Sequence, residues 1–305
     1  GCFGLSLAAL FPVLLAPLVG TALLSWAAQW AGLVFVPLSR RLSDDEIAYC
    51  IENAAAALVI REGDELPDGE EHPGALDLDD REPSLLLYTS GTTGKPKGAM
   101  VSHHNFLALM RIGGVEKPDW NKWSDQDVSL VAMPVFHIGG SGWGMLGLYH
   151  GARGIIAREF DPNKVLDFFE TFGITKLFLV PAAMQFVVRQ PRARQVDFSR
   201  LKYMLYGASP IPAALLKECI EVFKCGFVQM YGMTETTGTI VALPPEDHVA
   251  ELERMRPARK SLPGLQAAHR HTDGKPLPPR PGGGGQKGGS NRKWSQGWDR
   301  LSGGL

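Results

Sequence analysis

One stretch of the sequence gathers the residue types that bind phosphate groups. It runs from Tyr88 to Gly98 and holds four serines and threonines, three glycines and two lysines directly after an apolar segment. Glycines let the backbone wrap closely around a ligand, hydroxyl and amide groups donate hydrogen bonds, and lysines neutralise negative charge. This combination predicts a polyphosphate-binding loop, called the phosphate loop below, formed by Thr89, Ser90, Gly91, Thr92, Thr93, Gly94, Lys95 and Lys97.

The phosphate loop is not a Walker A motif, because Thr89 stands where that motif needs its first glycine and Pro96 follows Lys95. The alternative interpretation is a solvated linker rich in serine and glycine. We favour the phosphate-binding interpretation, since linkers seldom follow directly on a buried strand. A hydrolase is not indicated, because the G-x-S-x-G nucleophile elbow is absent around Ser90, Ser141, Ser209 and Ser290.

Three further segments follow the phosphate loop in an order that resembles a known family. They read Met133-Pro134-Val135-Phe136-His137, Tyr206-Gly207-Ala208-Ser209-Pro210 and Gln229-Met230-Tyr231-Gly232-Met233-Thr234-Glu235. Together, the four segments resemble the ordered motifs of the adenylate-forming (AMP-binding) enzymes, which include acyl-CoA synthetases, aryl-CoA ligases, luciferases and peptide-synthetase adenylation domains. The resemblance runs from about Thr21 to Glu246 and is weaker beyond that point.

The resemblance implies a role for each motif. The phosphate loop would hold the β- and γ-phosphates of ATP, with Lys95 among the catalytic residues. Thr234 would hydrogen-bond the α-phosphate, Glu235 would ligate Mg²⁺, and His137 would border the acyl and thiol sites. The adenine would lie between Tyr231, followed by Gly232, and the turn formed by Gly207, Ala208, Ser209 and Pro210. The acyl pocket would be lined by Phe136, His137, Gly139, Gly140 and Met233.

The implied function is that of an acyl-CoA synthetase, which activates a carboxylic acid, here a fatty or other apolar acid, with ATP and transfers it to coenzyme A. Because the acid and ATP are both anions, this chemistry needs alignment and charge neutralisation by Mg²⁺, lysines and amides rather than a protein nucleophile. Two alternatives stay open: a non-catalytic nucleotide-binding remnant, and an adenylation domain that loads a carrier protein. At the level of residues, Thr234 and Glu235 could instead cap a helix, and His137 could be a core histidine.

The chain that must position these motifs alternates short apolar strands with helices, which is typical of an α/β fold with sheets flanked by helices. Strands are predicted at residues 33–36, 57–60, 84–88, 128–133, 154–157, 175–180, 201–206 and 227–231. Helices are predicted at residues 21–31, 43–53, 102–112, 142–149, 163–172, 181 onward and 212–223. Ligands bind at the carboxyl ends of strands in such folds, so the loops after Tyr88, Met133, Tyr206 and Tyr231 are expected to share one face. Pro37 is expected to end the first strand, and Met145 to Tyr149 to belong to the core.

We expect three parts along the chain. Residues 1–20 are an apolar segment of uncertain role that does not resemble the family's first strands, residues 21–272 are the large AMP-binding domain, and residues 273–305 are a Gly/Pro-rich tail that is disordered or out of frame. The family's ribose-binding Asp and its small C-terminal lid with a catalytic lysine find no counterpart here. We therefore expect the lid domain to be missing and ligase turnover to be weak.

Composition excludes several other classes of protein. The 31 Lys and Arg balance 32 Asp and Glu, which argues against a nucleic-acid-binding surface. Four scattered cysteines are too few for a disulfide framework, and a reducing cytoplasm fits. The apolar residues 1–38 are long enough to span a bilayer, but we favour a buried helix and strand there, with membrane association as the alternative. The oligomeric state is left open.

Overall fold

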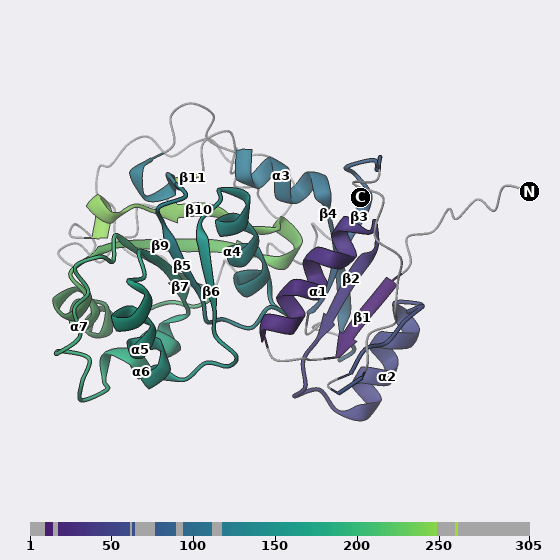
Figure 1. Ribbon diagram of the computed structural model, residues 1–305, viewed down its shortest axis with the longest axis horizontal. Coiled ribbons are helices and arrows are strands. Elements are labelled where there is room, and N and C mark those ends of the chain that lie inside the picture. The colour runs from purple at the N-terminus through teal and green to yellow at the C-terminus, as the bar shows by residue number, and fades with distance from the viewer. Residues whose placement is uncertain are drawn as a thin grey trace, which may run out of the picture. The chain divides into compact units, whose positions relative to one another are not determined.

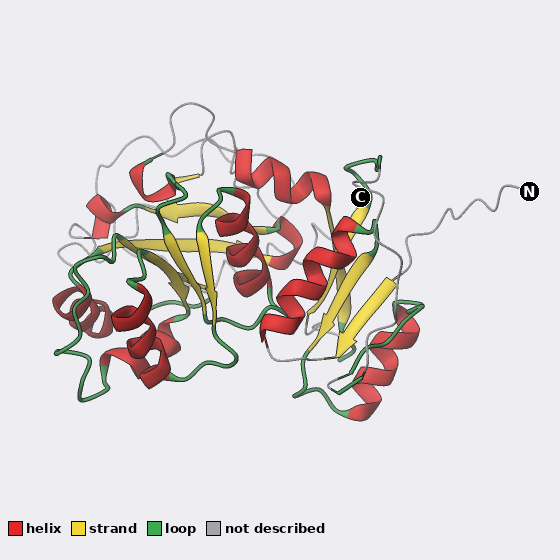
Figure 2. Cartoon of the chain, in the orientation of Figure 1, coloured by secondary structure: helices red, strands yellow, loops and turns green. Residues whose placement is uncertain are grey.

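The structure is a computed structural model that describes residues 10–14, 18–61, 63–64, 77–89, 94–111, 118–248 and 260–261. Within these residues, strands and helices alternate over most of the chain (Figure 1 and Figure 2). The strands form one sheet of four strands and one of seven. The predicted α/β class with sheets flanked by helices is confirmed.

The four-stranded sheet carries the phosphate loop. Its strands are β1 (Leu10–Leu14), β2 (Val34–Leu38), β3 (Pro83–Thr89) and β4 (Lys97–Ser102), in that order. The first three strands are parallel, and β4 returns antiparallel to β3. The helices in this part of the chain are α1 (Leu18–Trp30), α2 (Asp44–Asn53) and α3 (His103–Arg111).

The seven-stranded sheet carries the other three motifs. Its strands, from one edge to the other, are β11 (Lys260–Ser261), β10 (Gly238–Leu243), β9 (Gly226–Met233), β8 (Tyr203–Gly207), β7 (Lys176–Leu179), β5 (Val128–Val131) and β6 (Arg153–Ile156). The five strands from β9 to β6 are parallel, whereas β10 is antiparallel to both β9 and β11. The associated helices are α4 (Ile138–Tyr149), α5 (Pro162–Phe172), α6 (Pro181–Val188), α7 (Ala213–Phe223) and the short 3-10 helices η1 (Asp119–Asn121) and η2 (Thr234–Thr236).

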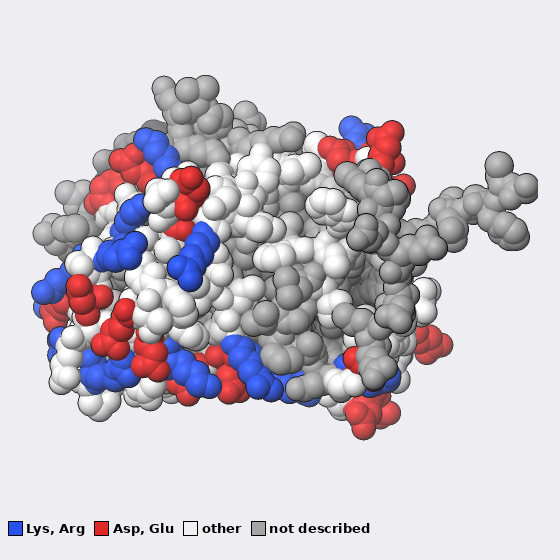
Figure 3. All heavy atoms as spheres, viewed as in Figure 1, with Lys and Arg blue, Asp and Glu red and all other residues white. Residues whose placement is uncertain are grey.

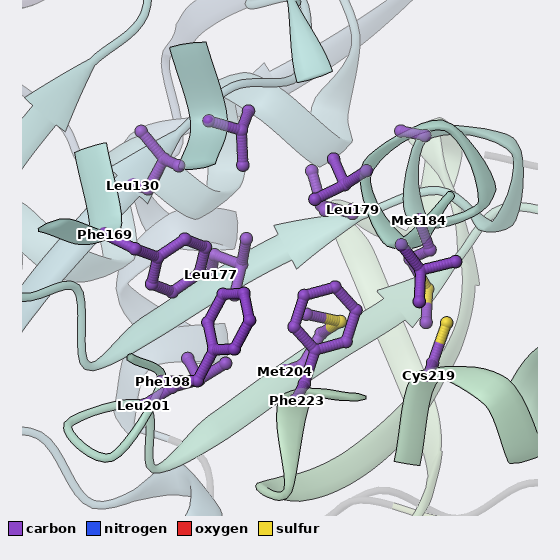
Figure 4. Close-up of a cluster of buried hydrophobic side chains, with 14 of the residues drawn as sticks. Leu130, Phe169, Leu177, Leu179, Met184, Phe198, Leu201, Met204, Cys219 and Phe223 are labelled. Carbon is purple, nitrogen blue, oxygen red and sulfur yellow. The ribbon is translucent and has the colours of Figure 1, made fainter. Parts of the chain in front are cut away.

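The main core lies between the seven-stranded sheet and the helices α5, α6 and α7. Leu130, Leu177 and Met204 on neighbouring strands are fully buried there, against side chains from all three helices (Figure 4). The ring of Phe198 meets those of Phe169 and Phe223 edge-on, with centroids 4.9 Å apart in both pairs. Close packing of this kind is the main source of stability in a domain of this size.

Two helix starts follow the signals in the sequence. Ser43 and Glu46 form the predicted capping box of α2, in which each side chain accepts a hydrogen bond from the other residue's backbone N–H. Asp161 caps α5 by accepting from the N–H groups of Asn163 and Lys164, and Pro162 occupies the first turn. These local signals fix both helix starts.

A buried ionic cluster joins the amino ends of the parallel strands. The carboxylate of Asp127 accepts hydrogen bonds from Lys202 Nζ at 2.7 Å and from Thr175 Oγ1 at 3.0 Å, and lies 3.8 Å from Lys176 Nζ. Lys176 is 1% exposed, donates to the carbonyl of Lys122 and lies over the ring of Trp123. Burial lowers the pKa of Lys176 to about 8, against the attraction of Asp127. The cluster therefore links the amino ends of β5, β7 and β8.

Several predicted elements differ from the structure. Residues 57–60 form no strand, and only Ile60 makes an isolated bridge. Pro37 lies inside β2 opposite Val13 rather than ending the strand. Leu10–Leu14, within the segment left without a role, forms β1. The predicted tail at residues 273–305 lies outside the described residues.

The alternative of a membrane span in the apolar first part of the chain can be compared with α1. This helix has 13 residues. Among the described residues, no helix combines the length and the apolar character that crossing a bilayer requires.

Candidate functional site

The phosphate loop connects two antiparallel strands. Thr89 ends β3 and pairs with Lys97, the first residue of β4, so the loop is the turn of a hairpin. The sequence predicted a helix as the next element and missed β4, whose residues have only a weak alternation of apolar and polar types. Gly94 has a φ of 88°, a left-handed conformation that favours glycine. Ser90, Gly91, Thr92 and Thr93 lie outside the described residues.

Both lysines of the phosphate loop are exposed. Lys95 Nζ lies 5.0 Å from the centroid of the Tyr49 ring on α2, within the range of a cation–π contact. Lys97 begins β4, and its carbonyl lies 3.4 Å from the Thr89 hydroxyl. The loop therefore presents two cations at the end of the hairpin, as a phosphate site requires.

The predicted adenine-binding turn follows β8. Gly207 is buried and pairs with Met230 on β9, and a Cβ at Gly207 would collide with the Met230 carbonyl. The next residue, Ala208, has a φ of 67°, so the chain turns sharply, and Ser209 and Pro210 are exposed. Because Tyr231 follows Met230, the structure brings this turn and Tyr231 together on adjacent strands.

A buried hydrogen-bonded pair lies behind this turn. The hydroxyl of Tyr206, the residue before Gly207, lies 3.0 Å from His248 Nε2, and His248 Nδ1 lies 2.9 Å from the carbonyl of Pro244. Since a carbonyl only accepts, Nδ1 carries the proton and Nε2 accepts from Tyr206. Burial lowers the pKa of His248, which favours this neutral form. The sequence analysis missed His248, because no local pattern links it to β8.

The turn after β9 holds Thr234 and Glu235 in the helix η2. Thr236 stabilises this turn, since its hydroxyl accepts from Met233 N–H at 3.1 Å and lies 2.8 Å from the carbonyl of Gly238. The capping interpretation of Thr234 and Glu235 is thus wrong: the N-cap is Met233, and its N–H is bound by Thr236, a residue without a predicted role. Among the described residues, the side chains of Thr234 and Glu235 have no hydrogen-bond or ion-pair partner.

The η2 turn joins the two sheets at the site. It contacts β4, and therefore lies beside the hairpin that carries the phosphate loop. Gly232 faces Gly238 so closely that a Cβ at Gly232 would collide with the Gly238 backbone. Glu235 is exposed, and its carboxylate is the kind of hard oxygen ligand that Mg²⁺ prefers. The residues present therefore fit the predicted nucleotide and metal site.

The segment before α4 places His137 at the helix start. Its ring is exposed and lies 4.6 Å from the ring of Phe136, and partial burial lowers its pKa. The interpretation as a core histidine is wrong, because the ring is not enclosed and makes no hydrogen bond to the described residues. A Cβ on Gly139 would meet Phe178 at 3.0 Å, and one on Gly238 would meet Ile138 at 3.6 Å. The start of α4 thus lies against β7 and the start of β10.

A cavity of about 350 Å³ lies beside α4, between this helix, the strands β5 and β6, and the α1–β2 segment. We call it the α4 cavity. It is lined by Ser25, Trp26, Phe35, Ser129, Val131, Val135, Gly140, Ser141, Gly144, Met145, Gly147, Leu148, Ala152, Gly154 and Ile156. The prediction that residues 145–149 belong to the core is wrong in part, because Met145, Gly147 and Leu148 line this space. Of the predicted acyl pocket, Gly140 lines it, whereas Phe136, His137, Gly139 and Met233 do not.

Three of the four predicted loops lie at one edge of the seven-stranded sheet, and the fourth, the phosphate loop, belongs to the other sheet. The strands β5, β8 and β9 run parallel, so the loops after them lie at one edge of the seven-stranded sheet. On the other sheet, β4, the strand that follows the phosphate loop, contacts η2. On the face seen in Figure 3, charged side chains gather over α5, α6 and α7, whereas the area over α4 is mostly uncharged.

Comparisons with known proteins agree with this arrangement. The family described as AMP-binding enzyme matches residues 13–286. A fatty acid–[acyl-carrier-protein] ligase, ScoC, from Streptomyces coeruleorubidus is 33% identical over 275 residues, which is 82% of this chain and 53% of the relative. A feruloyl-CoA synthase from an Amycolatopsis species is 33% identical over 246 residues, covering 74% of this chain and 49% of the relative. The chain thus spans about half the length of these relatives.

Solved structures share the fold. The N-terminal domain of FACL13 from Mycobacterium tuberculosis matches with a TM-score of 0.78 and 22% identity, over 90% of this chain and 74% of that one. The o-succinylbenzoate coenzyme A synthetase of Bacillus subtilis, solved in complex with AMP, matches with a TM-score of 0.75 and 24% identity, over 90% of this chain and 58% of that one. The predicted architecture of a large N-terminal domain is therefore confirmed.

Proposed function

Because the chain belongs to the family of AMP-binding enzymes, we propose that it takes part in the ATP-dependent activation of a carboxylic acid and its transfer to a thiol, with coenzyme A as the acceptor. In the first step, a carboxylate oxygen of the acid attacks the α-phosphorus of ATP. The bond between the α-phosphorus and the bridging oxygen breaks, which gives an acyl-adenylate and pyrophosphate. In the second step, the thiol sulfur attacks the acyl carbon, its proton passes to solvent, and AMP leaves. We assign this chemistry to residues 21–272.

The residues of the site supply charge and alignment for the first step. Lys95 and Lys97 neutralise the phosphates, and the turn after Gly207 holds the adenine against Tyr231. Thr234 donates a hydrogen bond to the α-phosphate, and Glu235 would hold Mg²⁺, which would supply positive charge to the phosphate oxygens. Such positioned cations and donors are the main source of rate in phosphoryl and nucleotidyl transfer.

One observation carries this proposal: Thr234 and Glu235 have no partner among the described residues, although their turn lies beside the phosphate loop. In the same turn, the hydroxyl of Thr236 is engaged with backbone groups of Met233 and Gly238. Water solvates these two groups in the absence of a ligand, so both remain available to bind one, and their turn contacts β4, the strand that begins with Lys97.

The acid that we propose is apolar. The α4 cavity begins beside the start of α4, shares Gly140 with the predicted acyl pocket and is lined mainly by apolar side chains. Its volume of about 350 Å³ lies in the range of small-molecule pockets. The names of the two relatives, a fatty-acid ligase and a feruloyl-CoA synthase, support an aliphatic or aryl acid.

The proposal can be tested by measuring the ATP-dependent release of AMP with a panel of carboxylic acids. We expect release with apolar acids and none without acid or without Mg²⁺. Calorimetric titration with ATP tests the nucleotide site independently of turnover, and the paired replacement of Lys95 and Thr92 by Ala should abolish that binding. Unaltered binding of ATP to the double variant would contradict the assignment of the phosphate loop.

A second acceptor deserves the same test, because one relative is named as a ligase for acyl-carrier protein. In that case the thiol of a carrier protein replaces that of coenzyme A, and the first step is unchanged. Parallel assays with each thiol, using an acid that supports adenylation, distinguish the two acceptors. Formation of thioester with the carrier alone would reassign the second step.

A further inference from the structure

We propose that Ser129 is a specificity-determining residue, and that the α4 cavity takes an acyl group that carries a hydrogen-bonding oxygen. This inference rests on the proposed function, since it concerns the acid consumed in that reaction. It arises from the one polar group of the cavity that the protein leaves without a partner.

Ser129 lies in the middle of β5, where the two faces of the sheet differ. Its neighbours Val128 and Leu130 point into the main core, so Ser129 and Val131 point to the opposite face, into the cavity under α4. The Ser129 side chain is buried at 1% exposure, and within the described part of the chain its hydroxyl has no hydrogen-bond partner. A buried hydroxyl without a partner costs on the order of 1–3 kcal/mol.

The other two serines of the cavity are paired. Ser141 Oγ donates to the carbonyl of His137 at 3.1 Å, and Ser25 Oγ accepts from the side-chain amide of Gln29 at 3.1 Å. The indole N–H of Trp26 is likewise engaged, 3.0 Å from the sulfur of Met145. Among these polar groups of the cavity, only the Ser129 hydroxyl thus has no partner within the described residues.

Two glycines border the Ser129 side chain. Gly147 on α4 packs over it, and a Cβ at Gly147 would be in van der Waals contact with the hydroxyl oxygen, at 3.5 Å. Gly154 on β6 is the strand partner of Ser129, and a Cβ at Gly154 would meet no atom within 4 Å. The open space next to Ser129 therefore lies on the side of Gly154.

The residues that line the α4 cavity indicate which acyl groups it can bind. Trp26, Phe35, Val131 and Ile156 present apolar surface, which favours an aryl or branched acyl group. Ser129 adds one donor and acceptor, which a hydroxyl, methoxy or keto oxygen on that group can satisfy. A pocket that holds a buried polar group rejects an analogue that lacks the partner, because the group is then left unpaired.

A matched pair of acids tests the inference: 3-phenylpropanoate and 3-(4-hydroxyphenyl)propanoate. We expect the protein to prefer the hydroxylated acid by about tenfold or more in kcat/KM for AMP release, and Ser129→Ala to bring this ratio close to one. The matched control Ser84→Ala removes a buried hydroxyl outside the cavity that is already paired with the Val101 carbonyl, and should keep the preference. Gly154→Val, which fills the open space, should exclude both acids while propionate is still activated.

A second measurement is independent of turnover. Without ligand, Ser129→Ala should raise the melting temperature, because the variant no longer buries an unpaired hydroxyl. In the unmodified protein, the hydroxylated acid should raise the melting temperature more than its analogue does, and Ser129→Ala should remove that difference. A merely structural serine would give a lower melting temperature on replacement and no change in the ratio.

The outcomes separate this inference from the proposed function. If acids are activated but Ser129→Ala leaves the preference unchanged, or the protein has none, the inference is overturned and the ligase assignment stands. If no acid releases AMP, the ligase assignment fails, and the melting temperatures decide the inference alone. Equal stabilisation by both acids, or by neither, would then overturn it.

Discussion

The polar side chains at the two ends of the seven-stranded sheet differ in whether other protein groups bind them. At the amino ends, Asp127 faces Lys176 and accepts hydrogen bonds from Lys202 and Thr175, so each of these groups has a partner. At the carboxyl ends, Thr234 and Glu235 project from a well-ordered turn without a partner among the described residues. Both ends are rich in polar groups, but Asp127 and Lys176 are buried and paired, whereas Glu235 is exposed and unpaired among the described residues.

This difference in pairing indicates which polar groups stabilise the fold. A buried ion pair must be satisfied within the protein, because water cannot reach it, and its loss leaves an uncompensated charge. An exposed carboxylate can remain unpaired because water solvates it until a ligand arrives. Removal of a group at the amino ends should therefore cost stability, whereas removal of one at the carboxyl ends should cost binding.

The largest effect is expected from Asp127→Ala. This change leaves Lys176 buried without its counter-charge, so we expect the free energy of unfolding to fall by about 3–5 kcal/mol in urea titrations. The control is Asp119→Ala, which breaks the exposed ion pair with Lys122 and should hardly move the unfolding midpoint. Equal losses in the two variants would remove the distinction between the two ends of the sheet.

The second prediction concerns the carboxyl ends. Glu235→Gln keeps the size of the side chain but removes the charge that we assign to Mg²⁺, so the affinity for ATP should fall by about tenfold or more when Mg²⁺ is present. The melting temperature should not change. The matched control Glu221→Gln, on the exposed side of α7, should leave affinity intact, and an identical loss in the absence of Mg²⁺ would contradict the metal role.

A third test compares two threonines in one turn. Thr236→Val removes a hydroxyl bonded to Met233 and Gly238, so stability should fall by about 1 kcal/mol. Thr234→Val removes a hydroxyl without a partner in the described structure, so stability should hold while ATP binding weakens. Urea titration and calorimetry on both variants check this, and a reversed pattern would mean that Thr234 is the structural residue.

The smallest effect is expected in the pH dependence of stability. Burial raises the pKa of Asp127, but the hydrogen bond from Lys202, the charge of Lys176 and the hydrogen bonds from Thr175 and Ser124 together bring it below its ordinary value. The stability that Asp127 contributes is complete above its unfolded pKa of about 3.9 and is lost as the pH falls through the lower folded value.

The protein should therefore lose stability below about pH 4 more steeply than Asp127→Asn, which cannot titrate there. Urea titrations of both proteins at several pH values between 5 and 3 measure the difference between the two curves. Curves that run parallel through this range would show that Asp127 does not carry a lowered pKa.

The sequence predicts the strands and helices of the parallel sheet well, because each has a local cause. Ser43 with Glu46, and Asp161 with Pro162, start helices by contacts within four residues, and apolar runs such as Thr175–Val180 mark buried strands. β4 was missed because its pairing with β3 depends on the hairpin rather than on its own composition. Pro37 was misread for a similar reason, since neighbouring strands hold it inside β2.

The candidate site is predictable in part. Motif order indicates Lys95, Tyr231, Thr234 and Glu235, but their proximity depends on contacts between segments far apart in sequence, such as β4 with η2. Tyr49 under Lys95, His248 behind Tyr206 and the open space beside Ser129 have no local signal. Only Thr236, two residues after Thr234, could have been found from the cluster of hydroxyls in the sequence.

The contact between Lys95 and Tyr49 has a consequence for how the nucleotide is received. The contact is worth about 0.5–1 kcal/mol at an exposed site and limits the orientations of a long side chain. Because the ammonium group has three N–H donors, those turned away from the ring stay available to phosphate oxygens. The ring of α2 therefore helps to hold in place, before any nucleotide binds, a charge that would otherwise move with a flexible side chain.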